Sequence, residues 1–491
     1  MASAIEKDIA KMPSNVKFSP KILLLLVYLF FCVRVIFSSW LAGIYLLSLL
    51  SIVFVWEYEK RKKRNPLFSY INVFIAGNVL TIGAGVILRV FGFPNDALTY
   101  TTGLDILVPL LFVGIISTLI GMVVYDFIFR HTPSETKLEN INKNSENLFK
   151  RMFVFSLILT TIYNLLCLNS QVAIRDTTNE QSTVGYILQA FTFLQYIPYI
   201  FLGLMLGVNT KAKKFWLVVA VAFVSWSAFI AALRGGRGII VYSLLLTLLS
   251  REMFKINYKR FLVSLLCLIA FTIPMLVIVA EYRGESEDLK TGDSNLLFEK
   301  AGAFAENQEN ETSAALILSR IYEGVSGKIV DIVLKTGEYA GFKNMDSLLY
   351  TYIPNRLLKS PVDKTQGNGV LIEMGLTTYE LSMFTKTPVI LLADSFRRWG
   401  VVGVIVVFIF CGFSLNALQN LLKVKQENIF FIIMYPLIMM NVYQLYVAAV
   451  PNLLNILFYQ FVKYGIIVAI FVLTYMNIFN SPKVFFRKIN G

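Results

Sequence analysis

The chain is 491 residues long, with 56% hydrophobic residues, only 15% charged residues and a net charge of +14. Because soluble proteins carry about a quarter charged residues, this composition excludes an ordinary soluble protein and makes lipid the solvent for most of the chain. The basic residues lie in short loops between apolar segments, which indicates membrane orientation and not a nucleic-acid partner.

The apolar segments predict an all-α polytopic membrane protein. A spanning helix needs about 20 mostly apolar residues. The basic N-terminus leads into such a run without a small-residue cleavage site, so we expect a retained first span. About twelve spans are predicted, at 21–37, 40–56, 67–92, 104–129, 152–169, 184–208, 215–233, 238–250, 261–280, 399–421, 428–449 and 452–477.

Loop charge predicts which side each loop occupies. The N-terminal segment and every second loop are basic, namely 60–64, 130–151, 211–214, 251–260, 423–425 and 483–488. By the positive-inside rule these lie in the cytoplasm, together with both termini. The alternating loops at 93–103, 170–183, 234–237 and 450–451 contain no lysine.

One predicted outer loop is much longer than the others. Residues 281–398 form a hydrophilic stretch that mixes helix-forming runs with Gly and Pro breaks, too long for a simple connection. We therefore divide the chain into a first membrane bundle at 1–280, a large extracytoplasmic loop at 281–398 and a second membrane bundle at 399–491.

Arginine is enriched on the predicted outer side, where the positive-inside rule does not account for it. Arg234 and Arg237 flank two glycines where a span begins, and Arg283 follows the ninth predicted span. Glycines allow close backbone approach, a helix N-terminus favours an anion, and a guanidinium binds phosphate oxygens in pairs. These features predict a phosphate or pyrophosphate site. Arg397 and Arg398, before the tenth span, are further candidates, and anchoring of helix ends at headgroups is the alternative for each arginine.

The absence of known catalytic motifs limits the reaction classes that the sequence supports. No phosphate-binding Gly-x-x-x-x-Gly-Lys-Ser/Thr loop and no His-Glu-x-x-His motif is present, and the single histidine, His131, lies in a predicted inner loop. We expect no metal and no cofactor. Arginines can stabilise a pyrophosphate leaving group, and a carboxylate can act as general base. Glu281 and Asp394 are the candidate bases, with ion pairing to adjacent arginines as the alternative for both.

Three stretches carry a resemblance to a known family. They are Ala232 to Gly238 at the start of a span, the large outer loop, and its later part from Tyr352 to Arg356 and from Ala393 to Gly400. In these the chain resembles bacterial oligosaccharide repeat-unit polymerases of the O-antigen and capsule type, the Wzy family. It departs from members that show an arginine followed sixteen positions later by glycine in two outer loops, because Ser250 and Glu299 stand at those positions.

The resemblance implies a membrane glycosyltransferase of the GT-C type in the bacterial cytoplasmic membrane. It would join undecaprenyl-pyrophosphate-linked oligosaccharides, with membrane lipids and a chain-length regulator protein as further candidate partners. The family's outer-loop arginines carry over onto Arg234, Arg237 and Arg283, and also onto Arg397 and Arg398. Two alternatives stay open: a flippase for the same lipid-linked sugars, and an O-antigen-type ligase, against which the lack of an outer histidine counts.

Overall fold

The structure is a computed structural model of the whole chain. It describes residues 40–61, 69–90, 103–129, 143–169, 191–207, 213–233, 237–253, 260–261, 263–268, 325–343, 345, 370–371, 373–376, 389–423 and 429–478. Within these residues the protein is helical and contains no β-strand.

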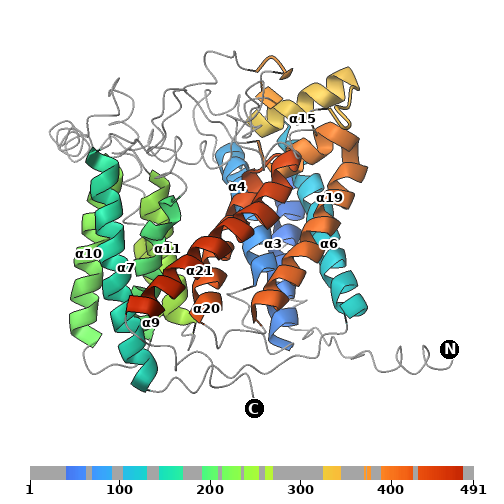
Figure 1. The fold of residues 1–491 in the computed structure, drawn as a ribbon. Helices are drawn as coiled ribbons and strands as arrows, with labels where there is room; N and C mark the ends of the chain where they lie inside the picture. Colours follow the sequence, from blue (N-terminus) through green and yellow to red (C-terminus); the bar gives the residue numbers. More distant parts are fainter. Residues whose placement is uncertain are drawn as a thin grey trace, which may run out of the picture.

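The helices form two groups joined by the last two long helices (Figure 1). One group contains α3 (Trp40–Arg61), α4 (Tyr70–Val90), α6 (Leu104–Phe129) and α19 (Leu391–Lys423). The other contains α7 (Lys143–Asn169), η2 (Thr192–Tyr196), α9 (Ile197–Gly207), α10 (Lys213–Leu233) and α11 (Arg237–Glu252). Between them run α20 (Ile429–Gln444), the short turns η4 (Leu445–Val447), η5 (Val450–Asn452) and η6 (Asn455–Tyr459), and α21 (Gln460–Ile478).

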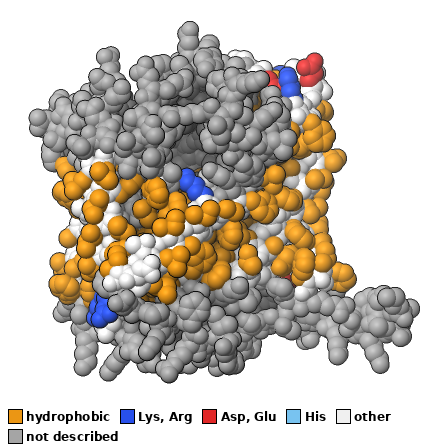
Figure 2. Space-filling model, in the orientation of Figure 1, with side chains coloured by type: hydrophobic (Ala, Val, Ile, Leu, Met, Phe, Trp, Pro, Cys, Tyr) orange, Lys and Arg blue, Asp and Glu red, His pale blue; other side chains and the backbone are white. Residues whose placement is uncertain are grey.

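Four helices of the described part are long and apolar enough to cross a membrane. They span Leu104–Phe129, Asn147–Cys167, Leu391–Leu422 and Val450–Ile478, and shorter apolar helices span Tyr70–Val86, Leu194–Gly207 and Ile429–Val442. Hydrophobic side chains form a broad band across the face of the molecule shown in Figure 2. These features confirm the prediction of a helical membrane protein, while the number of twelve spans stays a prediction.

The predicted spans from residue 40 onward are helical over most of their described residues, with shifted ends. Leu104–Phe129 has the predicted bounds, whereas α7 begins at Lys143, nine residues before the predicted span at 152. The predicted span at 399 begins within α19, whose first residue is Leu391. The predicted first span, 21–37, lies outside the described residues.

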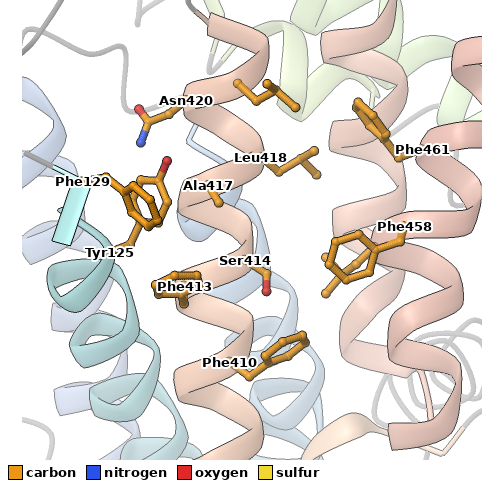
Figure 3. A pocket seen from close by; sticks show the side chains of 12 residues that line it. Tyr125, Phe129, Phe410, Phe413, Ser414, Ala417, Leu418, Asn420, Phe458 and Phe461 are labelled. Atoms are coloured by element: carbon orange, nitrogen blue, oxygen red, sulfur yellow. The ribbon is translucent and has the colours of Figure 1, made fainter. Parts of the chain in front are cut away.

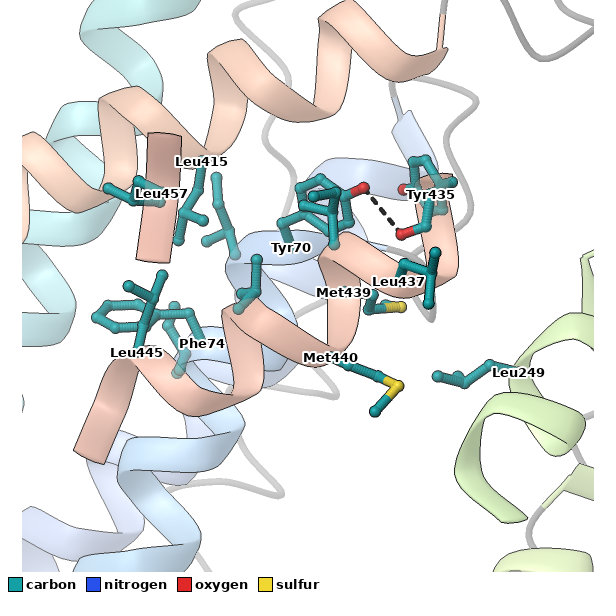
Figure 4. Packing of buried hydrophobic residues seen from close by; sticks show 14 of the residues in the cluster. Tyr70, Phe74, Leu249, Leu415, Tyr435, Leu437, Met439, Met440, Leu445 and Leu457 are labelled. Carbon is teal, nitrogen blue, oxygen red and sulfur yellow. Dashed lines mark hydrogen bonds between the residues drawn. The ribbon is translucent and has the colours of Figure 1, made fainter. Parts of the chain in front are cut away.

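The core between the two groups is built around α20 (Figure 4). The ring of Tyr70 stacks on Tyr435 with centroids 4.9 Å apart, and its hydroxyl donates a hydrogen bond to the Tyr435 carbonyl at 3.0 Å. On the other side of α20, Met440 points toward Leu249 of α11. Both residues are buried members of one continuous hydrophobic cluster, so α20 packs against both groups.

Glycines allow α6 and α19 to pack closely against each other. A Cβ atom at Gly121 would collide with the carbonyl of Ile409, and one at Gly412 would collide with the carbonyl of Thr118. Small residues of this kind let helix backbones approach within a membrane, where helix association depends on tight packing. Gly203 and Gly207 of α9, four residues apart, make the same kind of approach to α11 at Thr247 and Arg251.

This packing gives a testable expectation. Gly412→Ala should lower the free energy of unfolding by about 1–3 kcal/mol, the usual cost of overpacking a tight interface. Gly465→Ala is the matched control, because its Cβ would lie 3.8 Å from Phe430, an ordinary contact. Thermal unfolding of both variants in detergent measures the difference, and equal stability of the two would contradict the close backbone approach.

Candidate anion-binding site

A buried charged cluster lies where the first turns of α19 meet α15 (Val325–Thr336). α15 lies across the ends of α6 and α19 (Figure 1). It can lie close to α6 because Gly103, with φ +80°, has no Cβ to collide with the carbonyl of Gly327. Ser326 of α15 accepts a hydrogen bond at Oγ from the Ile390 N–H at 3.2 Å, just before α19 begins.

Helical spacing brings three predicted residues together. Asp394, Arg397 and Arg398 stand three and four residues apart, so they share one face of α19. Arg397 Nε donates to Asp394 Oδ1 at 2.9 Å, and Arg398 Nε donates to Asp394 Oδ2 at 3.0 Å. All three residues are at most 2% exposed. Asp394 also lies in the first turn of α19, where the helix dipole favours a negative charge.

A kink in α19 follows the arginines directly. Trp399 has φ −140°, and Gly400 has φ 62° and ψ −148°, a combination that essentially only glycine adopts. The interrupted helix leaves the carbonyls of Arg397 and Arg398 without their usual partners. The N–H groups of Ala340 and Gly341 donate to these carbonyls at 3.0 and 2.9 Å. The segment after α15 is thereby fixed against the kink.

Neighbouring segments complete the cluster. Arg398 Nη1 donates to the carbonyls of Gly341 and Lys343, at 3.2 and 2.7 Å. Glu373 Oε2 lies 3.2 Å from Arg397 Nη1, and Glu373 Oε1 lies 3.0 Å from Lys343 Nζ. The N–H of Val450 in η5 donates to Asp394 Oδ2 at 2.8 Å, which connects the cluster to the last long apolar helix.

One nitrogen in this cluster has no partner among the described residues. Arg397 Nη2 is buried and makes no hydrogen bond to any residue that the structure describes. A buried guanidinium nitrogen without an acceptor is costly, because its hydration is lost without compensation. Lys343, Arg397 and Arg398 are three cations facing the two carboxylates of Glu373 and Asp394. Counted over the described residues, the cluster therefore has an excess of positive charge and an unused donor, as an anion-binding site requires.

Asp394 is held in a fixed network of hydrogen bonds. Its two oxygens accept three hydrogen bonds, from Arg397, from Arg398 and from the Val450 N–H. A carboxylate held in this way orients the two guanidinium groups. Whether Asp394 or Glu281 acts as the general base stays a prediction, because Glu281 lies outside the described residues.

The other predicted anion-binding residues are only partly described. Helix α10 ends at Leu233 and α11 begins at Arg237, so a helix starts at the predicted Gly-Gly turn. Arg234 and Arg283 lie outside the described residues, and so does the side chain of Arg237. The structure therefore brings together Asp394, Arg397 and Arg398 and does not test the first arginine group.

Two features of this site were missed by the sequence analysis. Glu373 and Lys343 are 24 and 54 residues from Arg397 along the chain, so no local spacing connects them. The adjacent arginines were the one feature of the sequence that could have indicated a further acidic partner, because two buried guanidinium groups need more than one carboxylate. Two aromatic pairs beside the kink were missed as well: Tyr339 with Phe396 at 6.3 Å and Phe342 with Trp399 at 5.3 Å, both edge to face.

Comparison of the chain with models of protein families, with curated proteins and with solved structures finds no match.

Proposed function

We propose that this chain polymerises lipid-linked oligosaccharide repeat units at the outer face of the bacterial cytoplasmic membrane. The reaction is a metal-independent glycosyl transfer from a polyprenyl-pyrophosphate donor, with both termini of the chain in the cytoplasm and about twelve spans. The observation that carries the proposal concerns Arg397, beside Arg398 at the predicted outer end of α19. Its Nη2 is buried and has no hydrogen-bond partner in the described part of the chain.

The chemistry of this cluster suits a pyrophosphate leaving group. Charge develops on the leaving oxygens as the sugar–phosphate bond breaks, and donors fixed in advance stabilise that charge most effectively. Arg397 is fixed by Asp394 at Nε and by Glu373 at Nη1, which leaves Nη2 for the substrate. A guanidinium held at two of its three nitrogens loses little freedom when it binds an oxyanion.

The surroundings of the cluster suit a glycan. The side chains of Tyr339 and Phe342 are 54% and 78% exposed, and they lie beside the kink that follows the arginines. Exposed aromatic rings next to an anion site can pack against the apolar face of a sugar whose pyrophosphate is held by the arginines. This arrangement supports a lipid-linked saccharide over a free phosphate.

Analysis of lipid-linked glycans in cells that lack the protein tests the proposal. We expect single repeat units to accumulate on the carrier lipid at the outer face, because export continues while polymerisation stops. Restoration of polymer by the wild-type chain, but not by Arg397→Lys, would connect the activity to this cluster. Repeat units confined to the inner leaflet would instead identify a flippase, and normal polymer that fails only to reach its final acceptor would identify a ligase.

A further inference from the structure

A large apolar cavity lies along α19 (Figure 3). Its lining residues on α19 lie between Phe410 and Leu421, beyond the kink that separates them from the charged cluster. Its volume is about 640 Å³, within the range of roughly 300–1,000 Å³ typical of small-molecule sites. One wall comes from α6 and α19, and the other comes from η6 and the start of α21. Phe458 and Phe461 face Ser414 and Leu418 of α19 across the cavity (Figure 3).

Aromatic rings dominate the lining. Tyr125, Phe129 and Phe413 form a cluster on the α6 side, with ring centroids 4.7 to 6.2 Å apart. The amide of Asn420 already donates a hydrogen bond to Asn416 Oδ1 at 3.3 Å, so it is engaged within the protein. The cavity therefore offers a hydrocarbon surface and hardly any polar recognition, and a soluble polar metabolite would not fit it.

The position of the cavity indicates that its occupant comes from the bilayer. It lies between Leu104–Phe129, Leu391–Leu422 and Val450–Ile478, all of which can cross a membrane. Phe410 is ten residues beyond Gly400 and Leu421 is twenty-one beyond it, which corresponds to about 15 and 32 Å along a helix. The predicted tenth span begins at 399, and one leaflet of the hydrocarbon core is about 15 Å thick. Measured from that predicted edge, the cavity begins near the depth where an outer-leaflet acyl chain ends.

We propose that this cavity, called the tail cavity below, binds the hydrocarbon chain of the same lipid whose pyrophosphate binds at Arg397. The identity of that lipid rests on the proposed function. A polyprenyl chain longer than one leaflet can reach from the charged cluster past the kink into the tail cavity. The aromatic walls offer such a chain an apolar surface, and α19 carries both the headgroup site and the tail cavity.

Photocross-linking tests where the chain lies. The full-length protein in lipid nanodiscs is labelled with a polyprenyl phosphate that carries a diazirine in the second half of its chain. We expect cross-links within 410–421 and 457–461. Ala417→Phe, and independently Ser414→Phe, should reduce labelling there at least tenfold, because a ring at either position fills the tail cavity. Val406→Phe is the control, since Val406 is an exposed side chain of α19 outside the cavity lining.

A phospholipid with a diazirine in its acyl chain tests the alternative, that ordinary membrane lipid fills the cavity. Equal labelling of the same residues by this probe would show that inner-leaflet phospholipid fills the cavity, and it would overturn the proposal. Cross-links from the polyprenyl probe that fall outside 410–421 and 457–461 would overturn it as well. Unfolding temperatures of both filled variants near that of Val406→Phe would show that lost labelling is not lost folding.

Kinetics separate this proposal from the proposed function. Ala417→Phe should raise KM at least fivefold for a long-chain polyprenyl substrate and leave KM unchanged for a farnesyl analogue, which is too short to reach the cavity. Polymer formation with an unchanged long-chain KM would overturn the tail cavity and leave the polymerase standing. Specific cross-linking in a protein that makes no polymer from either substrate would support the tail cavity and overturn the polymerase.

Discussion

Arg397→Lys is expected to lower the rate of polymer formation by about 10²–10³-fold, the usual loss when a fixed oxyanion donor is removed. Lysine keeps the positive charge but has one ammonium group in place of three guanidinium nitrogens. It cannot contact Asp394, contact Glu373 and present a third donor at the same time. The measurement is polymer length and initial rate from purified lipid-linked repeat units.

Arg260→Lys is the matched control for this substitution. Arg260 also pairs with a buried carboxylate, Glu252, through Nη2 at 3.1 Å, but it lies in a loop predicted to face the cytoplasm. We expect this variant to keep most of the wild-type rate. Unfolding temperatures should be recorded for both proteins, so that a loss of folded protein is not read as a loss of chemistry. A wild-type rate in Arg397→Lys would remove the main support for an anion site at Nη2.

The helices were predictable where apolar composition alone decides them. The segment 104–129 is strongly apolar between Asp105 and Asp126, and the observed helix has the predicted bounds. The prediction failed at the start of α19, because Asp394, Arg397 and Arg398 make 391–398 appear hydrophilic in sequence. In the structure these charges pair with one another and are buried, so the helix begins eight residues before the predicted span. The predicted boundary at 398/399 coincides instead with the kink at Trp399 and Gly400.

The candidate site was predictable only in its local part. An excess of arginine on the predicted outer side pointed to Arg397 and Arg398, and the i, i+4 spacing of Asp394 is visible in the sequence. The contributions of Glu373, Lys343 and the Val450 N–H depend on how distant segments fold together. The carbonyls of Gly341 and Lys343 belong to the backbone, so the residue types at these positions do not indicate that they bind Arg398. Their part in holding Arg398 follows only from the path of the chain after α15.

Asp394→Asn is expected to destabilise the fold strongly and to reduce activity as a consequence. Asp394 is fully buried and holds both arginines, whose charges would then be left without a carboxylate on α19. Breaking a buried ion pair by removal of one partner costs about 3–5 kcal/mol, because the remaining charge is buried and uncompensated. The carboxylate now accepts hydrogen bonds from three donors, and the amide would also direct its own N–H₂ donor at one of them.

Asp331→Asn supplies the control, since Asp331 also pairs with a basic residue four positions later, on α15 of the same region. Lys335 Nζ lies 2.6 Å from Asp331 Oδ2, but the side chain of Lys335 is 73% exposed, and such surface pairs contribute about 0–1 kcal/mol. Thermal unfolding should therefore separate the two variants clearly. The same comparison decides the role of Asp394. If Asp394→Asn unfolds like the wild type yet forms no polymer, then Asp394 is the general base and not a residue that positions the arginines. If stability and rate fall together, and Asp394→Glu restores part of both, the carboxylate acts by holding Arg397 and Arg398 in place.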